Sequence, residues 1–462
     1  MKNYLSKLLS GKKVLILGYG REGRSTLNYL LNNIPDTHIT IADRNESAFT
    51  GDQTAHSPNI IRLSESAYPN DLKEYDIIIK SPGISLFKTS ATYNPGSITS
   101  QTDLFLAVYG KQTIGITGTK GKSTTSSLIY HILQTGTQPV VFGGNIGMPL
   151  FELIDKITPE TRIVAELSSH QLEYTTHAPH IAILLNLYQE HLDHYKSYID
   201  YQKAKFNIAL NQQPGDYFIY SANDLLIKQL IDNYSTKSIH LPSLQEESNK
   251  TGIVQSGDEI NLILDDQLKR LLPKKFNLQL PGEHNRNNAM IAAAAASLCN
   301  IPPSDIENAV GTFVPLEHRL QYIGTLAGIK YYNDSISTIP EAAIAAMESL
   351  KPVDTIILGG FDRGIDYTSL VEYLNNGNVK NIVTTGEAGL RIYKLLQSSN
   401  ISAAIYFYSK FEDAVLKAIE VTPKSGLCLL SPAASSYNEF KNFEERGRRF
   451  KDIILRSQIT NR

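Results

Sequence analysis

The chain has 462 residues, a formal net charge of -2, 42% hydrophobic residues and 19% charged residues. This length suits two to four domains, and the near-neutral charge gives no electrostatic reason to expect a nucleic acid partner. The N-terminus is too polar for a signal peptide, and no apolar run reaches about 18 residues, so we expect a cytoplasmic protein without membrane contact. Cys299 and Cys428 lie in apolar segments, which favours reduced core thiols over a disulfide.

Up to about residue 107, short apolar runs alternate with helical patterns, which predicts a parallel sheet. The motif Gly18-x-Gly20-x-x-Gly23 begins at the last residue of the first run, "VLILG", and opens a helix, while Asp43 ends the next run, "HITIAD". Such glycines let the backbone approach a diphosphate at a helix N-terminus, and the acid meets a ribose or a base. The motif alone indicates a nucleotide without saying which one.

A second unit begins with the expected strand "TIGIT" and continues as "GTKGKSTT". Gly118 and Gly121 supply a turn, and Ser123 begins a helix whose free N–H groups point at phosphate. Lys122 is placed to contact the β- and γ-phosphates, and the Ser123 hydroxyl to hold Mg²⁺. The standard P-loop spacing is not met, because Ile116 occupies its first glycine position. A plain glycine-rich turn does not explain two lysines and three hydroxyls within residues 120–125, so we predict a phosphate site.

Acidic and imidazole side chains follow two further buried strands. Glu166 lies at the end of the expected strand "RIVAEL" (162–167), and His191 and Asp193 come after "IAILLNL". Parallel α/β sheets bind ligands at the carboxyl ends of their strands, and carboxylate with imidazole beside a phosphate loop suits a divalent cation. Lys205 lies in a helix that we expect to begin near Tyr198, where a lysine is ordinarily a solvated surface residue.

The remaining chain predicts an Ala-rich helix and a third α/β unit. His284, Asn285 and Asn288 lie where the Ala-rich helix opens, and helix capping accounts for only one asparagine there. Five further strands are expected in "IKYYND", "DTIILGG", "NIVTTG", "AIYFY" and "GLCLLS". We place domain boundaries near residues 107 and 315, and residues 235–275 are too polar and irregular to assign.

Together these residues resemble the Mur ligase family of ATP-dependent amide ligases in peptidoglycan synthesis. The resemblance spans nearly the whole chain, because its motifs occur in family order: "SPGIS", "GITGTKGKSTT", "GGNIGMPL", "ELSSHQLE", "NLYQEHLDHY", "AK", "GEHNRNNA", "HRLQ", "NDS", "LGGFDRG" and "LSPAASSYNEFKNFEERGRRF". The phosphate loop of this family reads G-x-x-G-x-x-G-K-[ST], and the chain matches it with Gly115, Gly118, Gly121, Lys122 and Ser123.

The resemblance implies an α/β protein of three domains: a Rossmann-like domain for the UDP substrate (1–107), a central P-loop-type ATPase with a mainly parallel sheet (108–315), and a Rossmann-like domain for glutamate (316–462). It implies that ATP phosphorylates the carboxylate of UDP-MurNAc-L-alanine and that the amine of glutamate attacks the resulting acyl phosphate. ATP and Mg²⁺ are the implied cofactors, the partners are these small molecules, and a monomer is the expectation.

The family motifs also imply a role for individual residues. The ATP-side positions are Gly118, Thr119, Lys120, Gly121, Lys122, Ser123, Thr124, Asn285, Asn288, Arg319 and Asp334. The UDP-substrate positions are Gly18, Tyr19, Gly20, Asp43, Arg44, Asn145 and Ser168, of which the last two match either the substrate side or the metal side. The glutamate positions are Thr338, Arg363, Ser436 and Phe443. The metal positions are Ser123 and Glu166 for the Mg²⁺ bound to ATP, His191 for a second Mg²⁺, and Lys205, whose N-carboxylated form supports the metal and the γ-phosphate. The catalytic positions are Lys122, His191, Lys205 and Arg319.

The sequence departs from the usual family residues at His170, Glu190, Glu317, Ile336 and Arg363. Ile336 and Arg363 stand where relatives often carry lysine near the γ-phosphate and glutamate, so the amino acid stays open: D-glutamate is the expectation and L-glutamate the alternative.

Two hypotheses from other classes stay open on the residues alone. An NAD-dependent dehydrogenase would use the first glycine motif but gives "GITGTKGKSTT" no role. A nucleotide-sensing regulator without catalysis would not need Glu166, His191 and Lys205 together.

Overall fold

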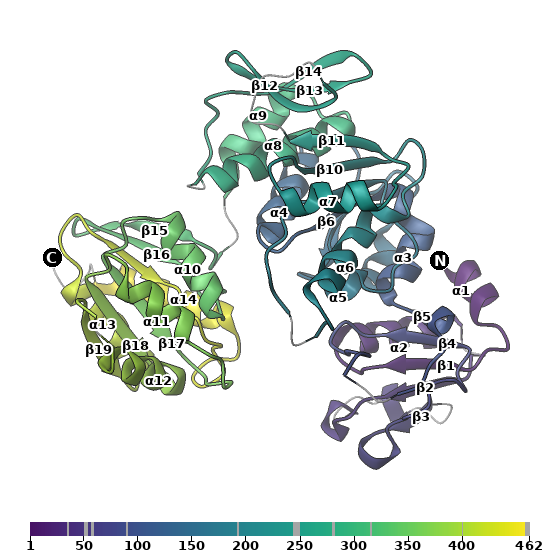
Figure 1. Ribbon diagram of the computed structural model, residues 1–462, viewed down its shortest axis with the longest axis horizontal. Coiled ribbons are helices and arrows are strands. Elements are labelled where there is room, and N and C mark those ends of the chain that lie inside the picture. The colour runs from purple at the N-terminus through teal and green to yellow at the C-terminus, as the bar shows by residue number, and fades with distance from the viewer. Residues whose placement is uncertain are drawn as a thin grey trace. The chain divides into compact units, whose positions relative to one another are not determined.

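Three β-sheets with flanking helices build the protein, as a computed structural model shows (Figure 1). The structure describes residues 1–34, 37–49, 54–56, 60–88, 91–191, 194–243, 250–279, 282–314, 317–399 and 401–457. The predicted α/β class is confirmed. Contacts divide the chain into two compact units, one formed by residues 1–278 and 284–313, the other by residues 279–283 and 314–462.

The first sheet has five parallel strands, because crossover connections join its apolar runs. The runs 14–17 and 39–42 are buried along their length, whereas the edge run 60–63 is partly exposed. In sheet order the strands are β3 (Ile60–Leu63), β2 (Ile39–Ala42), β1 (Val14–Leu17), β4 (Ile77–Lys80) and β5 (Ile98–Thr99). The helices of this region are α1 (Lys2–Leu9), α2 (Arg21–Asn33) and α3 (Gln101–Tyr109). Since β1 lies between β2 and β4, chain connections leave it in opposite directions, and the sheet has its switch point there (Figure 1).

The second sheet has nine strands and carries the phosphate loop. In sheet order they are β14 (Gln267–Pro273), β13 (Glu259–Leu264), β12 (Gly252–Ser256), β11 (Ile239–Ser243), β10 (Tyr217–Ser221), β9 (Ile181–Leu184), β6 (Thr113–Thr117), β8 (Arg162–Glu166) and β7 (Val140–Gly144). Its helices are α4 (Lys122–Leu133), α5 (Ser169–Leu172), α6 (Tyr198–Leu210), α7 (Leu225–Asn233), α8 (Glu283–Leu298) and α9 (Pro303–Thr312). From β12 to β7 each pair of neighbours is parallel.

The segment that the sequence left unassigned, residues 235–275, contains the strands β11 to β14. β12, β13 and β14 form an antiparallel meander. Asp265 and Asp266, between β13 and β14, both have positive φ, at +51° and +59°, as a two-residue hairpin turn requires. These strands are short and partly exposed, and they carry polar residues at several positions. The sequence therefore lacks the clear alternation of apolar and polar residues that predicts a strand.

The third sheet belongs to the second unit and has six strands. In sheet order they are β15 (Gln321–Leu326), β16 (Ile329–Asn333), β20 (Leu427–Leu430), β17 (Thr355–Gly359), β18 (Asn381–Thr385) and β19 (Ala404–Tyr408). Its helices are α10 (Pro340–Ser349), α11 (Thr368–Asn375), α12 (Gly386–Gln397), α13 (Phe411–Val421) and α14 (Phe443–Ser457). Only the β15–β16 pair is antiparallel.

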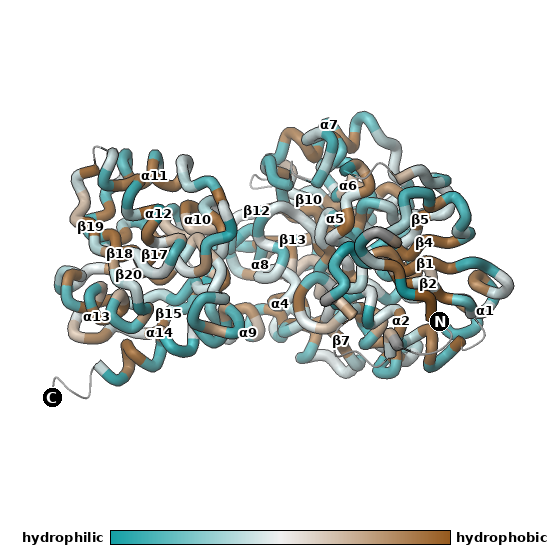
Figure 2. The backbone as a smooth tube through the Cα atoms, turned by 90° about the horizontal axis from the view of Figure 1, so that it is seen from below, coloured by the Kyte–Doolittle hydropathy of each residue, from teal (hydrophilic) through white to brown (hydrophobic). Residues whose placement is uncertain are grey.

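The cores lie where the helices pack on the sheets, and the strands β1, β2 and β4 are strongly apolar, as their brown segments illustrate (Figure 2). Cys299 and Cys428 are both buried and free. Among the described residues, none of the helices has the length and apolar character needed to cross a membrane. The boundary predicted near residue 107 falls within α3, and the division into three domains stays a proposal.

Candidate active site

The phosphate loop joins β6 to α4 and needs glycine at two positions. Gly118 and Gly121 have φ values of +149° and +85°. A Cβ atom on Gly118 would lie 2.9 Å from Leu185 Cβ, and one on Gly121 would lie 3.0 Å from Asn288 Nδ2. The loop therefore presents bare backbone ahead of the N-terminus of α4, where free N–H groups bind phosphate. The predicted adenine-side residue Asn288 lies next to this loop.

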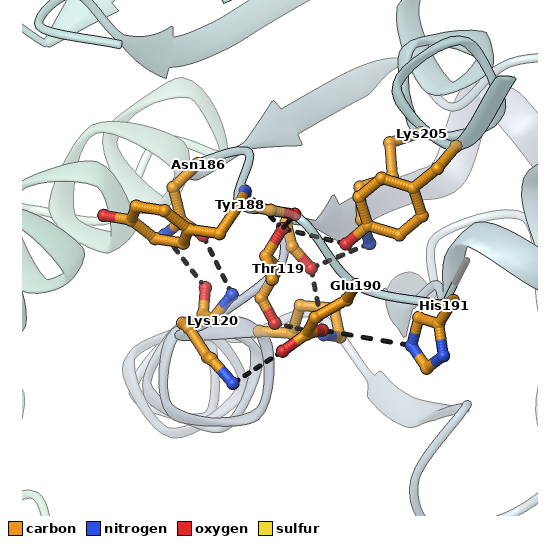
Figure 3. Close-up of polar contacts among 10 residues, drawn as sticks. Thr119, Lys120, Asn186, Tyr188, Glu190, His191 and Lys205 are labelled. Carbon is orange, nitrogen blue, oxygen red and sulfur yellow. Dashed lines mark hydrogen bonds and ion pairs between the residues drawn. The ribbon is translucent and has the colours of Figure 1, made fainter. Parts of the chain in front are cut away.

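The segment after β9 holds the phosphate loop in place (Figure 3). Asn186 accepts a hydrogen bond from Lys120 N at 2.8 Å through Oδ1 and donates to Lys120 O at 3.1 Å. The carbonyl of Asn186 accepts from Thr119 N at 3.0 Å. The Thr119 hydroxyl lies 2.8 Å from Tyr201 Oη and accepts from Tyr188 N at 2.9 Å. The shape of the loop is thus set by the protein itself.

Two lysine side chains meet at one carbonyl of the loop. Lys122 Nζ donates to Gly118 O at 2.9 Å and to Thr119 O at 3.0 Å, and Lys205 Nζ donates to the same Gly118 O at 2.9 Å. Lys205 lies on α6 and is only 2% exposed. Burial lowers the pKa of Lys205 well below its ordinary value of 10.5, and the charge of Lys122 acts in the same direction. The expectation that Lys205, like most lysines, lies on the solvated surface is therefore wrong.

Glu166 ends β8, the strand beside β6, and carries an unsatisfied oxygen. Asn145 Nδ2 donates to Glu166 Oε1 at 2.7 Å, and Asn145 N donates to the Glu166 carbonyl at 2.8 Å. Within the described part of the chain, Glu166 Oε2 is buried without a hydrogen-bond partner. A buried carboxylate oxygen is costly unless a ligand takes it. Ser123 is buried in the first turn of α4, which follows the neighbouring strand β6. Its hydroxyl can bind the same cation as Glu166 Oε2.

His191 lies at the end of the described segment after β9. Its φ is +58°, its side chain is 46% exposed, and Nε2 lies 3.9 Å from Glu190 Oε2 (Figure 3). Glu190 in turn pairs with Lys120 at 2.6 Å. The ring centroid of His170 is 4.6 Å from that of His191, and burial lowers the pKa of His170 well below its ordinary value. Asp193, also predicted here, falls outside the described residues.

Among the described residues, no group of three or more histidine, cysteine, aspartate and glutamate side chains is arranged so that it could hold a metal ion. The predicted metal ligands are not of that kind alone, because they combine Glu166 and His191 with a serine hydroxyl and a modified lysine. The unsatisfied Glu166 oxygen beside the phosphate loop fits a Mg²⁺ ion with its preference for oxygen ligands.

The first glycine motif packs as a nucleotide-binding turn requires. A Cβ on Gly23 would lie 2.2 Å from Gly18 O, so the helix approaches the strand closely. Asp43 accepts from Tyr19 N at 2.8 Å, which ties the turn to β2. The Tyr19 ring is fully buried, with its centroid 5.3 Å from that of Phe49, so its main chain rather than its ring is placed for a ligand. Gly20 and Arg44, the other two predicted residues, are exposed.

Two neighbouring residues at the start of α2 join the first sheet to the second. The Arg21 guanidinium donates to the carbonyls of residues 144, 145 and 147 at 3.0 to 3.3 Å. Glu22 Oε1 accepts from Gln171 Nε2 at 2.6 Å, and Gln171 Oε1 accepts from Ser168 N at 2.9 Å. Arg21 and Glu22, which lie within the first glycine motif, therefore hold the segments of the predicted substrate-side residues Asn145 and Ser168.

In the second unit, the predicted ATP-side residues Arg319 and Asp334 lie close enough for their charges to interact. Leu320 N donates to Asp334 Oδ1 at 3.1 Å, and Ser431 Oγ donates to Oδ2 at 2.8 Å. Burial raises the pKa of Asp334 to about 6, while the charge of Arg319 acts in the opposite direction. The two residues therefore interact electrostatically.

The four predicted glutamate residues lie at one edge of the third sheet. Thr338, Ser436 and Arg363 follow β16, β20 and β17, which are adjacent in the sheet, and Phe443 begins α14. Phe361 N donates to Ser435 O at 2.9 Å, which joins two of these connections. Ser436 is buried, Thr338 and Phe443 are half-buried, and Arg363 is exposed.

Residues that hold the site together were missed from the sequence. Asn186 is the first polar residue after β9, so the rule that found Glu166 could have found it. Tyr201 precedes Lys205 by one helical turn, which places both on one face of α6. Gln171 completes a capping box with Ser168, a pattern that suggests only a helix start.

Two family profiles match the chain. Residues 116–296 match the Mur ligase middle domain, and residues 318–434 match the Mur ligase glutamate ligase domain. These matches cover the parts of the chain that contain the phosphate loop and the third sheet. They confirm the resemblance that the motifs predicted.

Curated relatives extend the similarity over nearly the whole length. The chain is 32% identical to UDP-N-acetylmuramoylalanine–D-glutamate ligase of Clostridioides difficile, covering 96% of this chain and 99% of that protein. It is 33% identical to the Staphylococcus haemolyticus protein of the same name, with 97% and 98% covered. A MurF ligase from Thermotoga maritima in complex with ADP has a TM-score of 0.56 at 14% identity, with 99% and 97% covered, which shows likeness of fold.

Proposed function

The chain belongs to the Mur ligase family, and we propose on that premise that it joins D-glutamate to UDP-N-acetylmuramoyl-L-alanine in the cytoplasm. It is accordingly an ATP-dependent, ADP-forming amide ligase of peptidoglycan synthesis. The meeting of Lys122 and Lys205 at Gly118 O carries the argument for the chemistry. The near-full-length similarity to relatives named for D-glutamate supports the substrates.

The phosphate loop is suited to ATP. Backbone N–H groups at the start of α4 receive phosphate oxygens, and Lys122 leaves its two carbonyl partners to contact the β- and γ-phosphates. Asn288, whose amide group is beside Gly121, and Asn285 lie toward the adenine side. Thr119, Lys120 and Thr124 complete the loop.

Lys205 is suited to become a carbamate. Its buried amine, with a lowered pKa, can add to CO₂, forming one N–C bond and releasing one proton. The product carries a negative charge beside the phosphate loop, where a lysine would otherwise place a positive one. In this proposal Ser123 and Glu166 hold the Mg²⁺ that ATP binds, His191 holds a second Mg²⁺, and the carbamate supports the metal and the γ-phosphate. When bound there, Mg²⁺ supplies charge neutralisation to the phosphates.

The ligation proceeds in two balanced steps in this proposal. A carboxylate oxygen of the UDP substrate attacks the γ-phosphorus of ATP, ADP leaves, and an acyl phosphate forms. The glutamate amine then attacks the carbonyl carbon, the C–O bond to phosphate breaks, and the nitrogen loses a proton. Lys122 and Arg319 lower the energy of the charge that develops on the phosphoryl oxygens.

The substrates divide between the sheets in this proposal. The turn around Gly18, Tyr19 and Gly20 takes the UDP diphosphate, while Asp43 and Arg44 face the uridine side. Asn145 and Ser168 face the sugar-linked acyl group. Thr338, Arg363, Ser436 and Phe443 take glutamate, and the planar Arg363 guanidinium is suited to bind a carboxylate bidentately. Arg319 and Asp334 of the second unit are the further proposed ATP-side residues.

The deciding experiment measures ATP-dependent phosphate release with UDP-MurNAc-L-alanine and purified D- or L-glutamate in separate reactions. We expect turnover with D-glutamate and a kcat/KM at least about a hundredfold lower with L-glutamate, a typical effect of losing one well-placed charged contact. A preference for the L isomer would overturn the stereochemistry, and turnover with neither would overturn the substrate assignment.

A further inference from the structure

Arg446 is an arginine whose charge is buried inside the second unit. Its side chain is 1% exposed, and burial lowers its pKa to about 9. Its hydrogen bonds within the described part of the chain go to backbone carbonyls and to one serine hydroxyl. Because the guanidinium donates mainly to neutral backbone carbonyls, its hydrogen bonds fix the positions of those backbone segments.

These hydrogen bonds reach three separate strand connections. Arg446 Nε and Nη2 donate to Ser335 Oγ at 3.0 Å and Ser335 O at 2.9 Å, after β16. Nη1 donates to Ser435 O at 3.1 Å, after β20, and lies 3.5 Å from Gly359 O at the end of β17. Gly360 makes room for this approach, because a Cβ there would lie 2.9 Å from Nη1.

The same three connections carry the proposed glutamate residues. Thr338 lies three residues after Ser335, Ser436 follows Ser435 directly, and Arg363 lies on the loop that begins at Gly359. Phe443, the fourth proposed glutamate residue, is linked to Arg446 through Ser335, because Ser335 Oγ donates to Phe443 O at 2.8 Å. One guanidinium therefore contacts, directly or through Ser335, every segment that supplies a glutamate residue.

We propose that Arg446 is the positioning residue of the amino-acid site, setting the spacing of the four segments that hold glutamate. This inference rests on the proposed function for the identity of the ligand. The carbonyls of residues 335, 359 and 435 point their negative ends at one place, so they would separate without a cation between them. A planar fork with five donors can bridge them, whereas a lysine ammonium offers one point of attachment.

Arg446→Lys should therefore keep the fold and the buried charge but lose the alignment of the segments. We expect KM for the amino acid to rise about tenfold or more, as for loss of one charge-assisted hydrogen bond. KM for the UDP substrate should stay within about twofold, because that substrate is assigned to the first sheet, in the other unit. KM for ATP does not serve as a comparison, because Asp334, which the proposed function assigns to ATP, directly precedes Ser335. A residue with a merely structural role would change the KM values for the amino acid and the UDP substrate together, or only the melting temperature.

The test compares steady-state phosphate release by the wild type, Arg446→Lys and Arg449→Lys. Arg449 lies on the same helix and pairs with Glu412 near the surface at 2.6 Å, so its variant should match the wild type. Circular dichroism and melting temperature establish that each variant is folded. An amino-acid KM within about twofold of wild type, parallel rises in the KM values for the amino acid and the UDP substrate, or an Arg446→Lys protein that does not fold would each overturn the positioning role.

The wild-type reactions separate this inference from the proposed function. Turnover with D-glutamate supports the proposed function, and the ratio of variant to wild-type KM tests Arg446. If the wild type prefers another amino acid, the proposed substrate is wrong, and the same ratio is measured with the amino acid it accepts. A raised ratio in that case supports the positioning role alone.

Discussion

The side-chain amide of Asn145 donates to one oxygen of Glu166 at 2.7 Å and leaves the other oxygen buried without a partner among the described residues. The carboxylate is thus turned in one direction before a cation binds. Because partners of this kind orient metal ligands, Asn145→Ala should lower the apparent affinity for Mg²⁺ by about tenfold or more. A Mg²⁺ titration of phosphate release at saturating ATP checks this.

The control for Asn145 is the exposed Asn378 in the second unit. Asn378→Ala should keep the wild-type Mg²⁺ dependence. An Asn145→Ala enzyme with an unchanged Mg²⁺ dependence and a raised KM for the UDP substrate would instead assign Asn145 to substrate binding alone.

Lys205→Ala should be nearly inactive, and acetate should restore part of the activity. The alanine leaves a buried space beside Gly118 O in which a small carboxylate can take the place of the carbamate. The measurement is phosphate release with increasing acetate, with chloride at equal ionic strength as the comparison. Lys203→Ala, an exposed change on the same helix, should retain activity and show no acetate effect. Full activity of Lys205→Ala without acetate would rule out the carbamate.

Glu166 shows what the sequence can predict. An acid at the end of an apolar run, in a chain of alternating strands and helices, lies at the carboxyl edge of a parallel sheet. That rule places Glu166 beside the phosphate loop without knowledge of any contact. The same rule brings Thr338, Arg363 and Ser436 to one edge of the third sheet, because they follow adjacent strands.

Arg446 shows what the sequence cannot predict. It stands in "EERGRRF", which is typical of a solvated helix face. Its only signal is spacing, because it shares the buried face of α14 with Phe450, Ile453 and Ile454. Burial of a charge depends on which carbonyls surround it, and those come from connections up to 111 residues away. The ties from Arg21 and Glu22 to the second sheet depend on tertiary contacts in the same way.

Glu22 should make the stability of the protein depend on pH. Burial raises its pKa from 4.5 to about 7, against the opposite effects of the Gln171 hydrogen bond and the charges of Arg21 and Lys80. The stability contributed by the neutral form of Glu22 is fully present below about pH 4.5 and is lost as the pH rises to about 7. The reason is that Glu22 ionises at a lower pH in the unfolded chain than in the folded protein. A shift of this size corresponds to a change on the order of 3 kcal/mol in the free energy of unfolding.

Glu22→Gln cannot ionise, so it should not lose stability in this window. We expect its melting temperature relative to wild type to rise by several degrees between pH 5 and pH 8. Thermal melts of both proteins across this range, with the exposed change Glu74→Gln as control, test the assignment. Parallel pH dependence of Glu22→Gln and wild type would show that another group is responsible.

Lys122→Ala should abolish ADP formation and leave binding of the UDP substrate nearly unchanged. Lys122 lies on the phosphate loop of the second sheet, whereas the glycine motif proposed for UDP lies at the switch point of the first. The variant loses hydrogen bonds to Gly118 O and Thr119 O, but Asn186 and Tyr201 still hold the loop, so the fold should persist. Calorimetric titration with UDP-MurNAc-L-alanine and an assay of ADP release measure the two effects separately. Lys156→Ala, an exposed change in the same unit, should alter neither ADP release nor binding of the UDP substrate.

If a folded Lys122→Ala protein no longer bound the UDP substrate, the two nucleotides could not occupy separate sheets, and the assignment of the first glycine motif to UDP would have to be abandoned.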